Sequence, residues 1–338
     1  MDSQRKVLWV GTAALCIAIF LRLLSQGGSP FFAQSGEHSQ LLSFLVYLQT
    51  GRMVRYPSQT QPDTPPQIST PDAPGNSYNP DGAVLPVFSA DDLQGLTLTY
   101  GCDYRPALEP LLLSPLRWDL QKDGPTVLIV HTHATESYEK APGESYKEDA
   151  PYRTLDNHYN MISIGEELTR VLEAGGISVI HDKTLHDYPS YNGAYSHARS
   201  AIAAYLEQYP TISMVLDLHR DASDGEKGNQ LTTSATVGGQ LSSQLMLVVG
   251  TDASGNHHPA WRENLSLALK MTSLLEQQNP GITRPINLRA QRFNMDLTPA
   301  SLLVEVGAAG DSHQQALLAV NALGQTILAL AKGTGDLQ

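Results

Sequence analysis

The chain has 338 residues, of which 41% are hydrophobic and 17% charged, and its formal net charge at pH 7 is −12. The apolar fraction excludes a wholly disordered chain, and an acidic surface makes nucleic acid an unfavourable partner. The length is more than one hydrophobic core needs and less than three domains require, at ~100–200 residues each. The two cysteines, Cys16 and Cys102, are too few for a zinc ribbon, an iron–sulfur site or a disulfide-rich scaffold. Any metal site must therefore use histidines and carboxylates.

The N-terminal segment has the pattern of a membrane anchor. Arg5 and Lys6 precede an apolar run over 7–24, which just covers the ~17–25 residues of a bilayer-spanning helix. Small residues follow the run, but there is no clean Ala-x-Ala site, so we favour an uncleaved signal anchor over a cleaved signal peptide. The positive charges before the run predict that residues 1–6 are cytoplasmic and that the rest of the chain is extracytoplasmic.

Two segments separate this anchor from the body of the chain. Residues 25–55 are a predicted juxtamembrane segment, with an apolar patch that we expect to cover the outer face of the membrane. Residues 56–86 contain eight prolines among small polar residues and almost no aliphatic side chains. Such a composition cannot bury enough surface to fold, so we expect an extended, semi-rigid linker. This layout predicts a folded domain held at a distance from the membrane.

Residues 87–338 have the pattern of one α/β domain. In chain order we expect a strand at 127–130, a helix at 160–174, a strand at 177–180, a helix capped by Ser196 and ending before Pro210, strands at 212–218 and 245–249, a helix at 261–275, a strand at 302–306 and a helix at 316–331. Strands that are apolar on both faces and alternate with helices predict a sheet covered on both sides. Active-site residues in such sheets usually lie beyond the carboxyl ends of the strands.

Three of these strands carry polar side chains that could form a site. His133 and Glu136 follow the first strand, His219 and Arg220 end the third, and Glu305 lies inside the fifth. If the strands are neighbours, two imidazoles and one carboxylate converge, which is the ligand set of a hydrolytic zinc site with a free position for water. A separate carboxylate can then accept the proton of that water. The pattern therefore indicates a zinc hydrolase, with Glu305 as the expected base.

His131 and Glu305 each have an alternative interpretation. His131 shares a face with the residue two positions later, but the apolar run reaches Val130, so we assign His131 a buried supporting role. A carboxylate within an apolar strand costs several kcal/mol unless it is paired. The alternative for Glu305 is therefore a structural salt bridge, for example to Arg220 or Arg292. Metal-bound histidines also need an acceptor on their other ring nitrogen.

Several ordered blocks of sequence resemble the signature of the stage II sporulation protein P family. They include Val-Leu-Ile-Val-His131-Thr-His133-Ala-Thr-Glu136-Ser-Tyr138, Asp217-Leu-His219-Arg220-Asp221, Arg292-Phe-Asn294-Met-Asp296 and Leu-Val-Glu305-Val-Gly307. The resemblance runs from about Phe88 to the C-terminus and includes the layout of anchor and linker. It implies a three-layer mixed sheet with helices on both faces, similar to zinc-dependent amidases and carboxypeptidases.

The same resemblance implies a function and a ligand set. The family is a zinc-dependent peptidoglycan hydrolase that cuts the amide between N-acetylmuramic acid and L-alanine and also cleaves stem-peptide cross-links. It acts in forespore engulfment, outside the cell membrane, with stage II sporulation proteins D and M. Its pattern assigns zinc to His133, Glu136 and His219, with Glu305 catalytic. We expect an N-acetylmuramoyl-L-alanine amidase; the alternatives are a cross-link endopeptidase and a non-catalytic scaffold that binds the wall.

Some assignments stay open at this stage. The second metal ligand could be Asp156 or His158, just before the first helix, in place of Glu136. Arg220 could bind a substrate carboxylate as part of the catalytic site, or it could hold Asp221 or the carboxylate of the fifth strand. Asp217 and Asp221 are both candidates to accept a hydrogen bond from a ligating histidine. The segment from 311 to 316 departs from the family's usual Asn-Thr-x-x-Glu-Ala.

Overall fold

The computed structural model describes residues 88–116, 118–222 and 230–332. The chain divides into two units, Met1–Gly75 and Asn76–Gln338, and every described residue belongs to the second. The predicted cytoplasmic residues 1–6, anchor 7–24, juxtamembrane segment 25–55 and linker 56–86 lie outside the described residues. The fold described below runs from Phe88 to Lys332.

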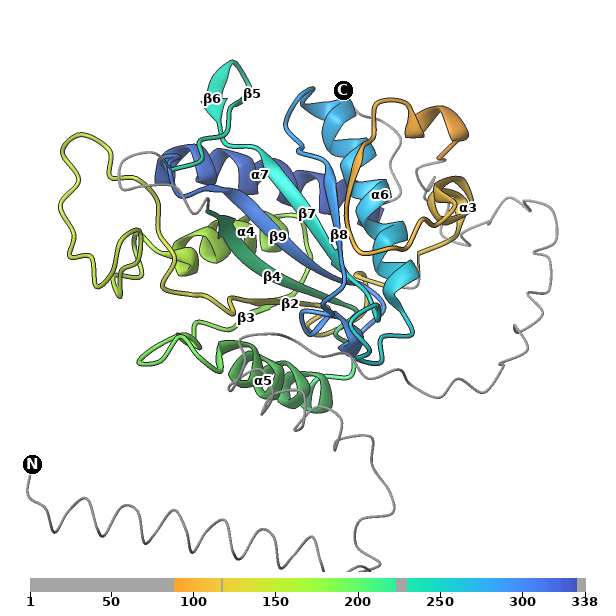
Figure 1. Cartoon of the computed structure of the whole chain (residues 1–338), viewed down its shortest axis with the longest axis horizontal. Helices are drawn as coiled ribbons and strands as arrows, with labels where there is room; N and C mark the ends of the chain where they lie inside the picture. The colour runs from red at the N-terminus through yellow and green to blue at the C-terminus, as the bar shows by residue number, and fades with distance from the viewer. Residues whose placement is uncertain (1–87, 117, 223–229, 333–338) are drawn as a thin grey trace, which may run out of the picture. The chain divides into compact units, whose positions relative to one another are not determined.

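The centre of the fold is a seven-stranded mixed sheet (Figure 1). Its strands lie in the order β1 (Leu98–Gly101), β8 (Ile286–Arg289), β7 (Leu245–Gly250), β9 (Ser301–Ala308), β4 (Met214–Asp221), β2 (Val127–Val130) and β3 (Val179–His181). β1, β8 and β7 are parallel to one another, and so are β9, β4, β2 and β3. The antiparallel pairing of β7 with β9 reverses the direction between these two groups. A separate hairpin joins β5 (Ala235–Val237) to β6 (Gln240–Ser242).

Helices cover both faces of the sheet. One face carries α4 (Met161–Ala174), α6 (Trp261–Gln278) and α7 (His313–Lys332), with the short α3 (Leu108–Leu113) against α6. On the other face, Ala198 and Ile202 of α5 (Ala194–Gln208) pack on Leu128, Val130 and Val215 of β2 and β4. Figure 1 shows α5 on the opposite side of the sheet from α4 and α7. The predicted three-layer α/β class is therefore confirmed.

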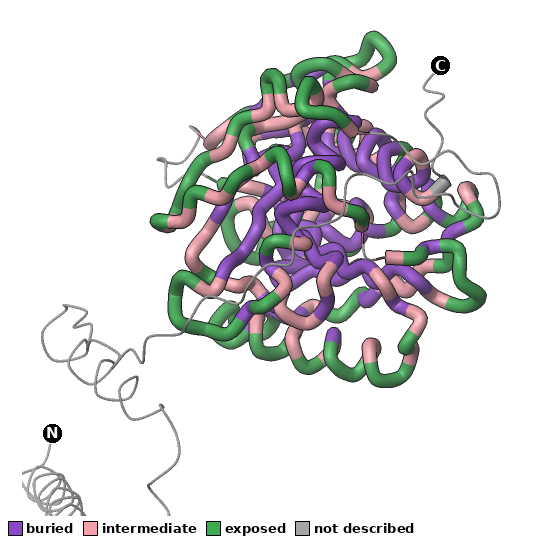
Figure 2. Tube along the Cα trace, turned by 90° about the vertical axis from the view of Figure 1, so that its right-hand side faces the viewer, coloured by how far each residue is buried: buried purple, intermediate pink, exposed green. Residues whose placement is uncertain are grey.

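The buried parts of the chain explain why these elements form. Every residue of β2 is buried, as expected of a strand covered on both faces. In Figure 2 the buried stretches gather in the middle of the fold, and exposed turns surround them. α4 begins after Asn160, whose side chain accepts a hydrogen bond from the Ile162 N–H at 3.0 Å, and it ends at Gly175. This is the usual chemistry of a helix start and stop.

The structure differs from the sequence-based expectation in the first residue of α5 and in several short elements that were not predicted. α5 begins at Ala194 after Gly193, which has a left-handed φ of 95°, and Ser196 lies inside its first turn instead of capping it. The Gly193 carbonyl accepts the N–H groups of Ser196 and His197 and so starts the helix three residues earlier. The pattern did not predict β1, β8, α3 or the strands β5 and β6 of the hairpin, each of which has six or fewer residues.

Among the described residues, one helix, α7, is long and apolar enough to cross a membrane. Its Ala316, Ala319, Val320, Leu323 and Ile327 are all fully buried in the main hydrophobic cluster. α7 is therefore a core helix of this fold.

Candidate active site

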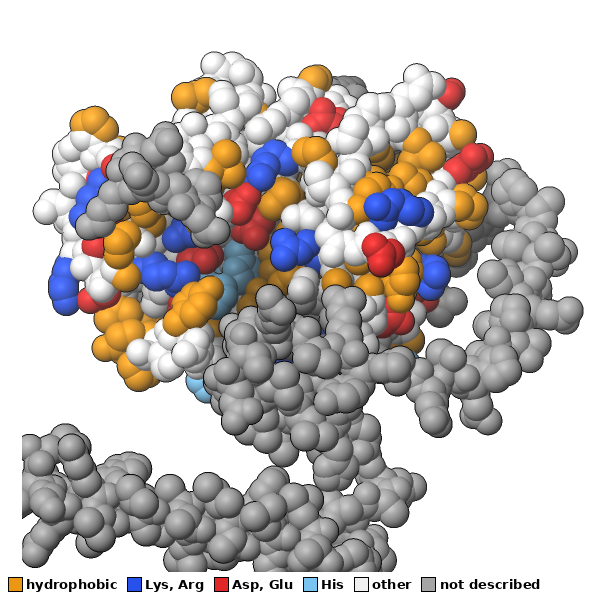
Figure 3. Space-filling model, viewed as in Figure 1, with side chains coloured by type: hydrophobic (Ala, Val, Ile, Leu, Met, Phe, Trp, Pro, Cys, Tyr) orange, Lys and Arg blue, Asp and Glu red, His pale blue; other side chains and the backbone are white. Residues whose placement is uncertain are grey.

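The carboxyl ends of β2, β4 and β9 bring the expected side chains together. β2 ends at Val130, and His133 lies in the turn that follows it. His219 of β4 is in direct register with Glu305 of β9, so their side chains share a face of the sheet. The ring centroids of His133 and His219 are 5.3 Å apart, with the rings nearly perpendicular at 87°. Figure 3 shows histidine side chains in a hollow of the surface, with acidic and basic groups around it.

Glu136 lies beside His219 and between two arginines. Its Oε2 is 3.6 Å from His219 Nδ1, and its Oε1 is 3.2 Å from Arg153 Nη2 and 3.7 Å from Arg220 Nη1. The Arg220 backbone N–H donates a further hydrogen bond to Oε2 at 3.3 Å. Burial alone would raise the pKa of Glu136, but Arg220, His219 and Arg153 hold this pKa well below its usual value. Glu136 is therefore an ionised carboxylate at neutral pH.

The two histidines differ in their protonation. Burial lowers the pKa of His133 to about 4, so its ring is neutral at pH 7, as a metal ligand must be. Burial would also lower the pKa of His219, but Asp217 and Glu136 raise this pKa well above its usual value. His219 Nε2 lies 3.0 Å from Asp217 Oδ1, in a close ion pair that lacks the alignment of a hydrogen bond. The acids around His219 thus favour a positive charge at this position.

Glu305 has an unusual environment for a carboxyl group. It lies between the fully buried Val304 and Val306, and its Oε2 is inaccessible and has no hydrogen-bond partner among the described residues. One side of the residue remains partly exposed, where it lines a pocket. Burial raises the pKa of Glu305 to about 8. A carboxyl group that titrates near neutral pH is suited to accept and return a proton.

The structure rules out the salt bridges considered for Glu305. The Arg220 guanidinium is buried and donates to the carbonyls of Ser137 and Tyr152, both at 2.9 Å, in addition to its contact with Glu136. Arg292 instead pairs with Asp296, at 3.3 Å. Among the described residues Glu305 therefore has no ion-pair partner, and neither of the expected salt bridges is formed.

The geometry also changes the roles expected of Arg220 and Asp221. Arg220 contacts neither Glu305 nor Asp221, because its guanidinium is used by Glu136 and the two carbonyls; we therefore treat it as a residue that positions Glu136. Asp221 pairs with Arg284 at 2.7 Å, so Asp217 is the acid beside His219. Asp217 is itself held by the N–H and hydroxyl of Thr132, at 2.8 and 2.6 Å.

The alternative second ligands lie apart from this cluster. His158 Nδ1 is 2.9 Å from Asp156 Oδ1, and the two form a pair of their own. The His158 side chain is 89% exposed and the Asp156 side chain 41% exposed. The carboxylate beside His219 is therefore that of Glu136 and not that of Asp156.

Five residues at the site have no role in the sequence-based prediction. Arg153 Nη1 forms an ion pair of 2.7 Å with Asp187, which also accepts hydrogen bonds from the N–H and hydroxyl of Thr135. The Tyr191 ring stacks on His133 with centroids 4.4 Å apart, and the Arg153 guanidinium lies 4.8 Å from the Tyr191 centroid. Tyr195 contacts His133 edge-to-face, with centroids 5.5 Å apart. These residues come from loops and from the start of α5, where spacing alone gives no signal.

Comparison with known proteins identifies the family. The profile described as stage II sporulation protein P (SpoIIP) matches residues 58–328. The chain belongs to this family. A relative from Bacillus subtilis (strain 168), named stage II sporulation protein P, is 26% identical over 214 residues, which is 59% of this chain and 49% of the relative. The chain thus spans about half the length of the curated relative that it matches.

Solved structures with some similarity to this SpoIIP chain include two amidases. An N-acetylmuramoyl-L-alanine amidase from Clostridium difficile 630 has a TM-score of 0.38 and 14% identity, covering 62% of this chain and 97% of that chain. The amidase AmiC2 of Nostoc punctiforme has a TM-score of 0.36 and 13% identity, covering 61% of this chain and 97% of that chain.

His131 lies beneath this SpoIIP site, in a buried supporting position. Its Nε2 is 2.8 Å from His181 Nε2, and its Nδ1 is 3.2 Å from the Leu218 carbonyl. Burial lowers the pKa of His131 to about 4, so the ring is neutral and one of the two Nε2 atoms donates to the other. The contact ties the end of β2 to the end of β3.

A glycine of α4 makes room for this histidine pair. A Cβ at Gly165 would collide with both His131 Nε2 and His181 Nε2. Helix propensity alone favours alanine over glycine by about 1 kcal/mol, whereas overpacking costs about 1–3 kcal/mol. Because these two effects oppose each other, we expect Gly165→Ala to lower the free energy of unfolding, measured by urea denaturation, by up to about 2 kcal/mol. Glu173→Ala, at an exposed position of α4, should change it little; a stabilised Gly165→Ala protein would contradict this packing argument.

The donor atoms at the site fit zinc in their chemistry. His133 Nδ1 and Glu305 Oε2 are buried atoms without hydrogen-bond partners among the described residues. The 3.6 Å between Glu136 Oε2 and His219 Nδ1 is close to the ~3.3 Å edge of a tetrahedron with zinc–ligand bonds of 2.0–2.1 Å. In the described part of the chain, no three His, Cys, Asp or Glu side chains stand together as a complete metal-binding group. His133, Glu136 and His219 supply the right donor atoms for zinc.

Proposed function

We propose that this SpoIIP family member is a zinc-dependent peptidoglycan hydrolase that cleaves the amide between N-acetylmuramic acid and the L-alanine of the stem peptide. One observation carries the proposal: the unpartnered, buried Glu305 carboxyl, with a pKa near 8, shares a face of the sheet with His219. Two imidazoles and a carboxylate beside it are the ligand types of a hydrolytic zinc site. Membership of a sporulation family supports cell-wall cleavage as the biological setting.

Under this proposal, each residue of the site has a separate role in amide hydrolysis. His133, Glu136 and His219 would hold zinc, which when bound lowers the pKa of a water molecule to about 7 and polarises the scissile carbonyl. Glu305 would accept the proton of the attacking water and return it to the leaving nitrogen. Arg153 and Arg220 keep Glu136 ionised. Asp217 orients the His219 ring from the other nitrogen.

The product spectrum on intact sacculi tests this function. We expect the full-length protein to release peptides that begin with L-alanine and to leave glycan strands with free lactyl groups, as identified by mass spectrometry. A chelator should stop the release, and added zinc should restore it. Shortened cross-links without free lactyl groups would assign the chain to the alternative, a stem-peptide endopeptidase. A chain that binds peptidoglycan but yields no product with zinc would be a non-catalytic scaffold.

The cellular setting follows from the sequence pattern. We propose a single-pass protein of the cell membrane, with residues 7–24 as the anchor and the catalytic domain outside, and with stage II sporulation proteins D and M as partners. Residues 56–86 would then act as the tether between membrane and wall. Protease added to intact protoplasts should remove the folded domain; its protection would contradict this orientation.

A further inference from the structure

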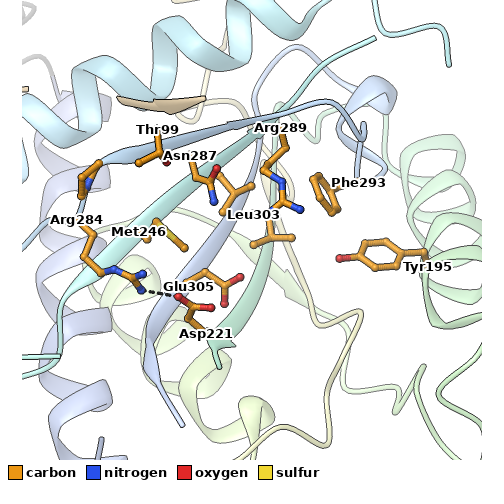
Figure 4. Close-up of a pocket in the computed structure, with 12 residues that line it drawn as sticks. Thr99, Tyr195, Asp221, Met246, Arg284, Asn287, Arg289, Phe293, Leu303 and Glu305 are labelled. Carbon is orange, nitrogen blue, oxygen red and sulfur yellow. Dashed lines mark hydrogen bonds and ion pairs between the residues drawn. The ribbon is translucent and has the colours of Figure 1, made fainter. Parts of the chain in front are cut away.

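A pocket beside Glu305 extends across the sheet, away from the metal ligands. It has a volume of about 290 Å³ and lies on the same face as α5, whose Tyr195 lines it and whose apolar side chains pack on β2 and β4 (Figure 4). Its floor contains one row of register partners from four adjacent strands, namely Leu303, Val248, Asn287 and Thr99. Tyr195 and Phe293 also line it. The pocket is therefore continuous with the reaction site at Glu305.

The two acidic residues of this pocket and its unpaired arginine lie at opposite ends. Asp221 and Glu305 lie at one end, and Asp221 is already paired with Arg284 at 2.7 Å. Arg289 and Asn287 come from β8, across the pocket from Glu305 (Figure 4). Within the described residues, the Arg289 guanidinium has no ion-pair partner, and its charge lies over the Phe293 ring, 5.9 Å from the centroid. The Asn287 side chain likewise has no hydrogen-bond partner in the described part of the chain.

The backbone makes space for the Arg289 side chain. On the neighbouring strand β1, Gly101 is in register with Arg289, and a Cβ at Gly101 would come within 3.0 Å of Arg289 Cδ. A larger residue at position 101 would force the Arg289 side chain into a different conformation. The unpaired guanidinium is thus held at the edge of the pocket by its surroundings and not by an acid.

The register sets the distance from Arg289 to the reaction site. Arg289 pairs with Gly250, and Val248 pairs with Leu303, so Arg289 lies two strands across and four residues along from Glu305. With strands about 4.8 Å apart and about 3.3 Å per residue, the two Cα atoms are about 16 Å apart. Side chains that reach into the pocket reduce the gap to about three residues of extended chain. A short extended peptide with a negative group near its far end would fill this gap.

We propose that Arg289 and Asn287 bind a free carboxylate and the adjacent peptide group of the stem peptide, while the scissile amide lies at Glu305. This inference rests on the proposed hydrolase function and names the part of the substrate that the pocket recognises. A guanidinium presents two parallel N–H groups that match a carboxylate, and the bond between them is stronger than one between neutral groups. The stem peptide carries such carboxylates a few residues from its amide to muramic acid. Asn287 can satisfy both the N–H and the C=O of a peptide group.

The test is a calorimetric titration of the zinc-loaded, full-length protein with two soluble stem tripeptides, one with free side carboxylates and one with these carboxylates amidated. For the wild type we expect amidation to weaken binding by about 10- to 100-fold. Arg289→Ala should bind the free tripeptide as weakly as the wild type binds the amidated one, so amidation should have little further effect. Arg289→Lys, which keeps the charge and loses the paired N–H groups, should fall between them.

The control variant is an arginine substitution outside the pocket. Arg262→Ala removes another unpaired arginine, which lies over Trp261 on α6 and does not line the pocket, and it should leave both affinities unchanged. Equal effects of amidation in the wild type and Arg289→Ala would overturn the proposal. So would Arg289-dependent binding of a glycan without peptide. A wild type that binds the tripeptide through Arg289 yet cleaves no peptidoglycan would instead refute the proposed function and leave a peptide-binding pocket.

Discussion

Replacing His219 with alanine should remove both zinc and activity. His219 Nδ1 faces Glu136 and its other nitrogen faces Asp217, so the substitution takes away a central donor and leaves two buried carboxylates without the imidazole between them. We expect zinc to fall from about one per chain to nearly none, and the rate of peptidoglycan cleavage to fall by roughly 10³-fold or more. Plasma mass spectrometry of the purified protein and dye release from labelled sacculi measure the two quantities. His133→Ala should behave in the same way.

His158→Ala is the matched control for this substitution. It removes a histidine that is 89% exposed and pairs with Asp156, so zinc content and rate should stay at the wild-type level. Thermal unfolding of all three variants separates loss of metal from loss of fold. If His219→Ala kept its zinc, or if His158→Ala lost it, the ligand set proposed here would be wrong.

Glu305→Gln should separate the chemistry from the metal. Glutamine keeps the shape of the side chain but cannot accept a proton from water, and general acid–base catalysis contributes about 10²- to 10⁴-fold. We therefore expect the cleavage rate to fall by about that factor while the zinc content stays near one per chain. Because the Glu305 Oε2 atom has no hydrogen-bond partner among the described residues and burial raises the pKa of this carboxyl to about 8, the neutral amide should also be tolerated in the fold.

The control for Glu305→Gln is the same substitution at an exposed acid. Glu166 of α4 pairs with Lys183 at the surface, with about half of each side chain exposed, and Glu166→Gln should leave the rate unchanged. Near-wild-type cleavage by Glu305→Gln would show that another group accepts the proton. Loss of zinc in Glu305→Gln would show instead that Glu305 acts as a ligand.

The predictable part of the fold is the part whose strands are buried on both faces. β2, β4, β7 and β9 contain unbroken apolar runs, because helices or loops cover both of their faces. β8 alternates buried and half-buried residues over four positions, and the edge strand β1 is mostly exposed, so neither has a pattern long enough to recognise. Both of these missed strands contribute polar side chains to the pocket, Thr99 from β1 and Asn287 and Arg289 from β8.

The site could be predicted only where polar residues interrupt an apolar strand or follow its end. His133, His219 and Glu305 meet this condition. Arg153, which contacts both Glu136 and Asp187, lies in a loop far from either in sequence, and only the folded chain brings the three together. Arg289 has no distinguishing neighbour in the sequence at all, and its significance comes from the lack of an acid near it among the described residues.

The reversal of strand direction between β9 and β7 has a consequence for how this protein can diversify. The segments that supply the chemistry leave β2 and β4 at one rim of the sheet, whereas Arg289 and Phe293 come from the far end of β8, which runs the opposite way. The two rims belong to separate stretches of the gene. If Arg289 binds the stem peptide as proposed, substitutions within 287–293 would change which wall peptides bind, while the proposed metal ligands and Glu305 keep their positions.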